Sequence, residues 1–345
     1  MDVPVWVWAV TVAVVAAMFV FDFYAHVRTP HFPTFRESAI WSAVYIGLAL
    51  LFGVGLWVVA GAQSGAEYFA GYVTEKSLSV DNLFVFLIIM TKFRVPKEYQ
   101  QKVLLVGVAI ALVLRGLFIW AGAAAIENFS WIFYFFGAFL VYTAVKIGRE
   151  DHDDMDAGVS SFHENRLLRL VRRVIPSTDE YHEDRLLIRE RGKLLMTPML
   201  VVMVAIGSTD VLFALDSIPA IYGLTEEPYI VFTANAFALL GLRQLYFLMG
   251  GLLQRLVYLS QGLAVILGFI GVKLVLHALH VNELPFINGG EPVEWAPEIP
   301  IWLSLLFILG TLTVATVASL MATRNQARRD AQADVQAETE AQEQG

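Results

Sequence analysis

The chain has 345 residues, of which 57% are hydrophobic and 16% are charged, and it contains no cysteine. Soluble domains usually carry about 25% charged residues, so this composition excludes an ordinary soluble protein. Without cysteine the chain has neither disulfides nor thiolate metal ligands. Its formal net charge of −8 gives no reason to expect a nucleic-acid partner.

Long apolar stretches recur along the chain, and each is long enough to cross a bilayer core as an α-helix. We therefore expect an all-α, polytopic membrane bundle of about nine transmembrane helices, which together form one transporter domain, 1–323. A cytoplasmic loop, 148–196, interrupts it, and a polar tail, 324–345, is expected to be disordered. The predicted spans are about 4–22, 39–60, 68–90, 102–124, 129–147, 197–223, 229–250, 256–277 and 300–322.

The basic residues outside the spans fall on one side of the predicted membrane. Lys and Arg occur in the odd-numbered loops and the C-terminal tail, whereas the even-numbered loops and the N-terminal segment contain acids and no Lys or Arg. Because cytoplasmic loops retain basic residues, we expect the N-terminus outside and the C-terminus in the cytoplasm.

The third span carries charges beside an unbroken apolar run. Its stretch "EKSLSVDNLFVF" begins at Glu75 and includes Lys76, Asp81 and Asn82. A charged residue at the centre of a membrane helix costs roughly 2.5–3.5 kcal/mol, so such residues usually have a function or a partner.

The sixth span repeats the pattern of the third. Its stretch "DVLFALDSIPAI" again places an acid, five residues, an aspartate and a small polar side chain in order. A helix with an intramembrane arginine follows each stretch, Arg115 after the first and Arg243 after the second. The matching positions are Glu75 with Asp210, Asp81 with Asp216, and Asn82 with Ser217.

The predicted topology makes the two stretches an inverted repeat, because the third span runs inward and the sixth runs outward. Inverted repeats with polar, interrupted helices are typical of transporters that bind their substrate near the bilayer midplane. Pro219 removes a backbone donor, so we expect it to bend or break the sixth span just after Asp216. Carbonyl groups freed there would be available as ligands.

Four acids, an amide and hydroxyls in a mirrored pair indicate an oxygen-lined cation site. Salt bridging is the competing interpretation, in which the second aspartate of each motif neutralises Arg115 or Arg243 and locks the bundle. Oxygen ligands without thiolate or imidazole suit Mn²⁺, Mg²⁺ or Ca²⁺. Asn235 and Asp22 are candidates for a gate. The predicted metal ligands are Glu75, Asp81, Asn82, Asp210, Asp216 and Ser217.

Four stretches strongly resemble the TerC family, particularly its Alx-like bacterial members, and the similarity runs from Asp22 to about Met321. They are "EKSLSVDNLFVF", "DVLFALDSIPAI", "FTANAFALLGLRQLYFLMGG" and "GLAVILGFIGVKL". The resemblance implies a nine-span protein of the bacterial inner membrane, within the LysE-type transporter superfamily, that exports Mn²⁺ and has an association with tellurite resistance. It implies membrane lipid and a divalent metal ion as partners, with the metal as cargo, no cofactor and no enzymatic activity.

The family's acidic site would fall on the same six positions. One departure stands before the second motif, where Gly207 replaces an expected glutamate and leaves metal preference and coupling open.

Two other interpretations stay open. One is a membrane-embedded partner that helps other proteins assemble or receive metal, which nothing in the sequence excludes alongside transport. The other is an intramembrane aspartyl protease, although the Gly-x-Gly-Asp signature of that class is absent from the chain.

Overall fold

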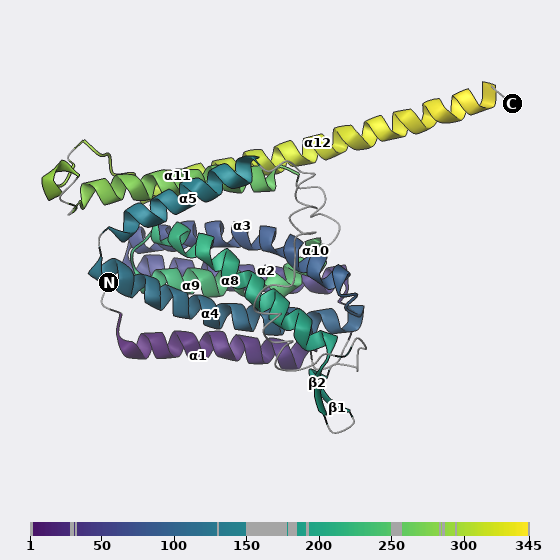
Figure 1. Ribbon diagram of the computed structural model, residues 1–345, viewed down its shortest axis with the longest axis horizontal. Coiled ribbons are helices and arrows are strands. Elements are labelled where there is room, and N and C mark those ends of the chain that lie inside the picture. The colour runs from purple at the N-terminus through teal and green to yellow at the C-terminus, as the bar shows by residue number, and fades with distance from the viewer. Residues whose placement is uncertain are drawn as a thin grey trace.

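The computed structural model describes residues 3–27, 31, 33–129, 131–149, 178, 185–190, 193–249, 257–282, 284, 287–293 and 295–343. The side chains of 325–343 and of several other helix positions, Asp81 and Asp216 among them, lie outside this description. The described part is a helical bundle with one small antiparallel hairpin at one end (Figure 1). The all-α fold class is therefore confirmed.

The α-helices in the described ranges are α1 Val5–Asp22, α2 Phe35–Ala60, α3 Ala62–Lys92, α4 Gln100–Asn128, α5 Ile132–Arg149, α8 Pro198–Tyr222, α9 Pro228–Leu239, α10 Leu242–Met249, α11 Leu259–His280 and α12 Ile301–Glu343. A π-helical turn, Phe23–Val27, continues α1, and short 3₁₀ turns cover Lys97–Tyr99 and Asn288–Gly290. The hairpin pairs β1, Leu187–Glu190, with β2, Lys193–Met196. Both strands belong to the predicted loop 148–196, most of which lies outside the described residues.

Seven helical segments within the described ranges are long and apolar enough to cross a bilayer. The acid-bearing helices α3 and α8 are not among the seven, and α8 contributes two shorter apolar stretches, Pro198–Gly207 and Phe213–Tyr222. The chain is thus a multi-span membrane protein, while the count of nine and the direction of insertion stay predictions.

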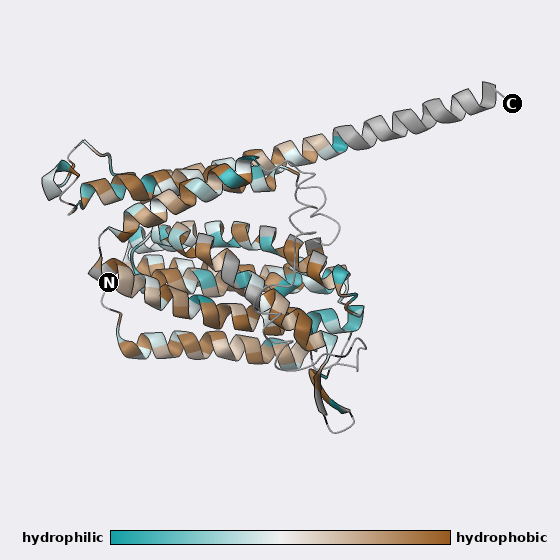
Figure 2. Ribbon diagram, in the orientation of Figure 1, coloured by the Kyte–Doolittle hydropathy of each residue, from teal (hydrophilic) through white to brown (hydrophobic). Residues whose placement is uncertain are grey.

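Apolar side chains cover the outside of the bundle as well as its interior. Figure 2 shows hydrophobic residues along most of the helices, with hydrophilic residues gathered where the chain turns at the hairpin end. Large apolar side chains such as Val59, Val113 and Trp120 are exposed on the outer faces. In water this surface would be costly, whereas in lipid it is the expected exterior.

Helices of the two matched stretches pack across one another. Helix α3 packs against α9, α4 packs against α8, and α5 packs extensively against α11. Exchanging the unit α3–α4–α5 for the unit α8–α9–α11 converts the first of these contacts into the second and leaves the third unchanged. This is the contact pattern of two repeats related by a two-fold axis, and their inversion in the membrane stays a prediction.

A break at Pro219 is contradicted, because α8 remains helical through Pro219 to Tyr222, whereas the alternative of a bend there stays a prediction. Pro219 lies in the last turn of the helix, and only three helical residues follow it before α8 ends at Tyr222. The break occurs instead in the seventh predicted span, between α9 and α10. There Leu240 is extended, with φ −60° and ψ 131°, and Gly241 has a φ of +80°.

The predicted disordered tail also differs from the structure. Helix α12 continues without interruption from Ile301 to Glu343. The physical reason lies in the composition of the tail, which is rich in Ala, Gln, Glu and Arg, all strong helix formers.

Candidate functional site

Small residues let α4 and α8 approach each other closely. A Cβ atom added at Gly107 of α4 would lie 2.6 Å from Cγ2 of Ile206 on α8. Reciprocally, a Cβ atom at Gly207 of α8 would lie 3.0 Å from Cγ2 of Ile110 on α4. Each glycine thus receives a side chain of the other helix, which is the packing that small residues permit in membranes. The position of the expected glutamate, Gly207, is part of this contact.

We predict that Gly107→Ala lowers the free energy of unfolding by about 1–3 kcal/mol, because the new methyl group overpacks the contact with Ile206. The matched control is Gly47→Ala, since no heavy atom lies within 4 Å of a Cβ built at Gly47. In an exposed helix the same change raises helix propensity by up to about 1 kcal/mol. Chemical unfolding in detergent micelles measures both, and equal effects of the two substitutions would contradict the proposed packing role.

Arg115 of α4 is fully buried and is clamped by Asp210 of α8. Its Nε donates to Oδ2 of Asp210 at 3.0 Å, and its Nη2 donates to Oδ1 of the same carboxylate at 3.2 Å. This two-pronged geometry is the strongest arrangement for an arginine and a carboxylate.

The remaining guanidinium nitrogen of Arg115, Nη1, reaches three more oxygen-bearing side chains. It donates to Oγ of Ser217 and to Oδ1 of Asn235, both at 3.0 Å. It also forms an ion pair with Oε1 of Glu75, which is fully buried on α3. The second oxygen of Glu75, Oε2, has no hydrogen-bond partner in the described part of the chain. Arg115 is therefore a buried cation inside a cage of oxygens from α3, α8 and α9.

The structure brings together one acid from each predicted motif, Glu75 and Asp210, on a single shared arginine. Asn82 is also buried, at 4% exposure, whereas the side chains of Asp81 and Asp216 lie outside the described residues. The described contacts of Arg115 thus involve the first acid of each motif, and the predicted salt bridges of the second acids stay untested. Asn235, a candidate gate residue, is a direct partner of Arg115.

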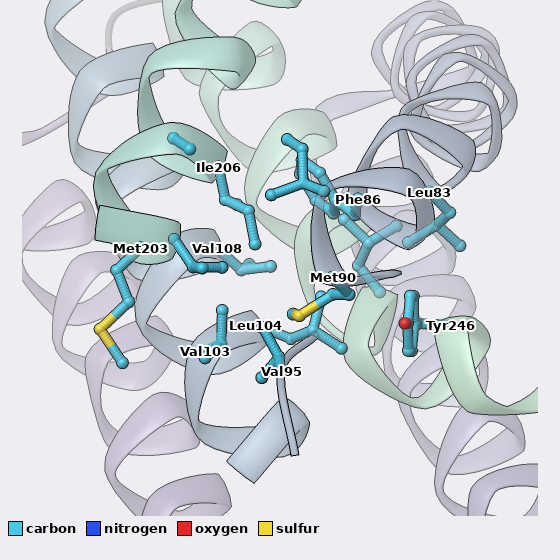
Figure 3. Close-up of a cluster of buried hydrophobic side chains, with 14 of the residues drawn as sticks. Leu83, Phe86, Met90, Val95, Val103, Leu104, Val108, Met203, Ile206 and Tyr246 are labelled. Carbon is cyan, nitrogen blue, oxygen red and sulfur yellow. The ribbon is translucent and has the colours of Figure 1, made fainter. Parts of the chain in front are cut away.

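Apolar clusters flank the Arg115 cage along the helices. Toward the hairpin end, side chains from α3, α4, α8 and α10 pack together, including Leu83, Phe86 and Ile206 (Figure 3). Toward the other end, Ile119 of α4 and Ile221 of α8 belong to a second cluster. Water exclusion on both sides strengthens electrostatic interactions inside the cage.

Arg243, the second predicted charge partner, has a different set of described contacts. Its Nη2 donates to Oδ1 of Asp22 at 2.8 Å, and its Nη1 hydrogen-bonds Oε1 of Gln101. The same oxygen of Asp22 accepts from the hydroxyl of Tyr45 at 2.9 Å and from Nε2 of Gln244 at 3.2 Å. Asp22, predicted as a possible gate, is therefore a buried counterion of Arg243.

Lys76 was not among the predicted site residues, yet it contacts the broken helix. Its Nζ donates to the backbone carbonyls of Ala238 at 2.9 Å and Leu240 at 3.3 Å. The sequence signal for the break itself is Gly241, since a glycine within a helical pattern marks a position where the backbone can leave the helix.

A polar cavity of about 500 Å³ opens at the end of the bundle opposite the hairpin, between α3, α11 and the start of α12. Glu67, Lys273, His277 and Glu298 are among its lining residues. At its edge Nε2 of His277 lies 2.8 Å from Oε1 of Glu226, and this hydrogen bond holds the pKa of Glu226 below its usual range. The predicted topology makes this end the outer face.

No group of three or more His, Cys, Asp or Glu side chains in the described ranges is arranged to hold a metal ion. The cage around Arg115 has the oxygen donors for a hard cation, but its central position is taken by the guanidinium. A metal ion would need the acids to rearrange or the undescribed carboxylates to take part.

Comparison with known proteins gives a consistent set of relatives. The sequence model of the integral membrane protein TerC family matches residues 60–327. The chain is 50% identical over 323 residues to an uncharacterized membrane protein of Mycobacterium tuberculosis, a match covering 93% of this chain and 81% of the relative. It is 40% identical over 279 residues to Escherichia coli Alx, which is named as a membrane-bound redox modulator, covering 78% of this chain and 85% of that protein. No solved structure matches the chain.

Proposed function

The chain belongs to the TerC family of integral membrane proteins, and on that premise we propose that it exports divalent metal cations, with Mn²⁺ as the expected cargo. The observation that carries the proposal is the buried cation surrounded by oxygens from α3, α8 and α9. Such a cage stabilises positive charge at a depth where water is excluded. Membrane transporters place their substrate sites between repeats in this way.

The donor chemistry of the site supports a hard or borderline divalent ion. Carboxylate, amide and hydroxyl oxygens are ligands that suit Mn²⁺, Mg²⁺ and Ca²⁺. The proposed ligands are the six predicted from the sequence, with Arg115 as the counter-cation that holds Glu75 and Asp210 in place when the metal is elsewhere.

The formal charge of the site also supports a divalent cargo. The two motifs supply four acids, while the neighbouring basic residues are Arg115 and Lys76, which leaves a formal charge of −2. Arg243 does not enter this balance because Asp22 forms its ion pair. This excess of negative charge favours a multiply charged cation, because each uncompensated charge in the membrane costs several kcal/mol.

The test is flux of labelled Mn²⁺ in liposomes containing the purified protein, with a pH gradient imposed or collapsed. We predict that the wild-type protein moves Mn²⁺, and that Asp81→Asn or Asp216→Asn reduces flux to the level of empty liposomes. Mg²⁺ and Ca²⁺ added as competitors give the selectivity. The response to the pH gradient shows whether protons are exchanged.

Glu98→Gln is the matched control, because it makes the same class of change at an exposed residue of the 3₁₀ turn. Flux from the wild-type protein equal to that of empty liposomes would contradict the proposal. Altered assembly of partner proteins with unchanged cell manganese would then favour the assembly or metalation role. Cleavage of a membrane reporter would favour the protease interpretation.

A further inference from the structure

The break between α9 and α10 exposes backbone oxygens inside the bundle. Helix α9 ends at Leu239, and the positive φ of Gly241 turns the chain before α10 begins at Leu242. Carbonyls in the last turn of a helix have no intrahelical donor, and they carry the negative end of the helix dipole. A cation is therefore favoured at this position.

The Lys76 side chain supplies a cation there. Its Nζ lies 2.9 Å from the carbonyl oxygen of Ala238 and 3.3 Å from that of Leu240. The contact joins α3 to the broken helix, although the two residues are separated by more than 160 positions in the chain. An ammonium on two carbonyls of an interrupted membrane helix occupies the kind of position where transporters bind cations.

Helices α3 and α9 connect the break to the Arg115 cage. On α3, Lys76 directly follows Glu75, which pairs with Arg115. On α9, Asn235 lies about one turn before Ala238 and accepts a hydrogen bond from Arg115. A metal ion entering the cage would thus lie near the ammonium of Lys76, and the two positive charges would repel each other.

We propose that the break between α9 and α10 is a second cation-binding position, that the Lys76 ammonium is its resting occupant, and that the transported divalent ion displaces it. The inference rests on the proposed export function and adds a second set of ligands, the carbonyls of Ala238 and Leu240. Lysine suits the task because its ammonium is a compact charge on a flexible four-carbon stem that can withdraw.

Displacement and simple helix capping predict different orders of Mn²⁺ affinity. If Lys76 competes with the metal, Lys76→Gln removes the competing charge while keeping an amide NH₂ group that can donate to the carbonyls, and Mn²⁺ binds at least about fivefold more tightly. Lys76→Arg keeps a charge that makes more hydrogen bonds and leaves less readily, so Mn²⁺ binds several-fold more weakly than to the wild type. Capping alone predicts the same Kd for all three, or the lowest Kd for the wild type.

The experiment is equilibrium binding of Mn²⁺ to the purified full-length protein in detergent. Lys273→Gln is the matched control, because it removes the other intramembrane lysine, which lines the outer cavity rather than the break. We expect this control to leave the Kd within about twofold of the wild-type value. The order Lys76→Gln, wild type, Lys76→Arg, from tightest to weakest, supports displacement.

A wild-type protein that binds Mn²⁺ and a Lys76→Gln variant that binds it no more tightly would overturn this inference and leave the export proposal standing. Absence of saturable Mn²⁺ binding by the wild type would overturn both. If Lys76→Gln is not recovered folded, Lys76→Arg decides, because a Kd equal to or below the wild-type value contradicts displacement.

Discussion

Arg115→Gln is expected to lower the free energy of unfolding by about 3–5 kcal/mol, among the largest effects of any single substitution in this chain. The change removes the one described cation between Glu75 and Asp210 and leaves two buried carboxylates without a partner. Breaking a buried ion pair from one side has this effect because the surviving charge stays desolvated. Chemical unfolding in detergent micelles, followed by tryptophan fluorescence, measures the loss.

Two further substitutions distinguish the effect of the lost charge of Arg115 from the effect of its lost packing. Adding Glu75→Gln and Asp210→Asn to Arg115→Gln makes the cage neutral, and the amides can hydrogen-bond one another. We expect the triple variant to recover most of the lost stability, as buried ion pairs replaced by neutral groups often do. It should nevertheless move no Mn²⁺ in liposomes. A triple variant less stable than Arg115→Gln alone would contradict the charge argument.

Asp22→Asn is expected to have the next largest effect, a loss of about 3–5 kcal/mol in the free energy of unfolding. One oxygen of Asp22 accepts hydrogen bonds from Arg243, Tyr45 and Gln244, so the substitution weakens three contacts and removes the negative charge that the guanidinium of Arg243 contacts. The same unfolding assay applies.

The control for Asp22→Asn is Tyr45→Phe, which deletes one of these hydrogen bonds and keeps both charges. The expected loss is about 0.5–1.5 kcal/mol, the usual net value of one hydrogen bond. Equal losses from the two substitutions would show that the ion pair between Asp22 and Arg243 contributes little. Flux measurements on Asp22→Asn test the separate prediction that Asp22 is a gate.

The sequence allowed the helical bundle to be predicted because a segment in lipid must satisfy its backbone polar groups by internal hydrogen bonds. A long apolar run is therefore a reliable marker of a membrane helix. The sequence also paired Glu75 with Asp210, and the structure brings both onto Arg115, whereas their role as metal ligands stays a prediction. The partner of each arginine was harder to predict. Residue spacing does not give the relative height of two tilted helices, and a shift of less than two turns decides which acid of a motif meets Arg115.

The helix break shows a second limit of sequence reasoning. Pro219 is the stronger signal in a sequence, yet its place in the last turn of α8 lets the helix continue. Gly241 is the weaker signal, and the break there is stabilised by Lys76, which comes from a helix distant in the sequence. A contact between residues so far apart in the chain is not visible in the local pattern.

The two arginines differ in where their partners come from. Every described partner of Arg115 lies within residues 60–327, the stretch matched by the family, whereas Asp22 and Tyr45 precede it. A polypeptide beginning at residue 60 would keep the first network whole and strip Arg243 of its described acid. The first helix, α1, is therefore no detachable extension, because it supplies the described counter-charge of Arg243.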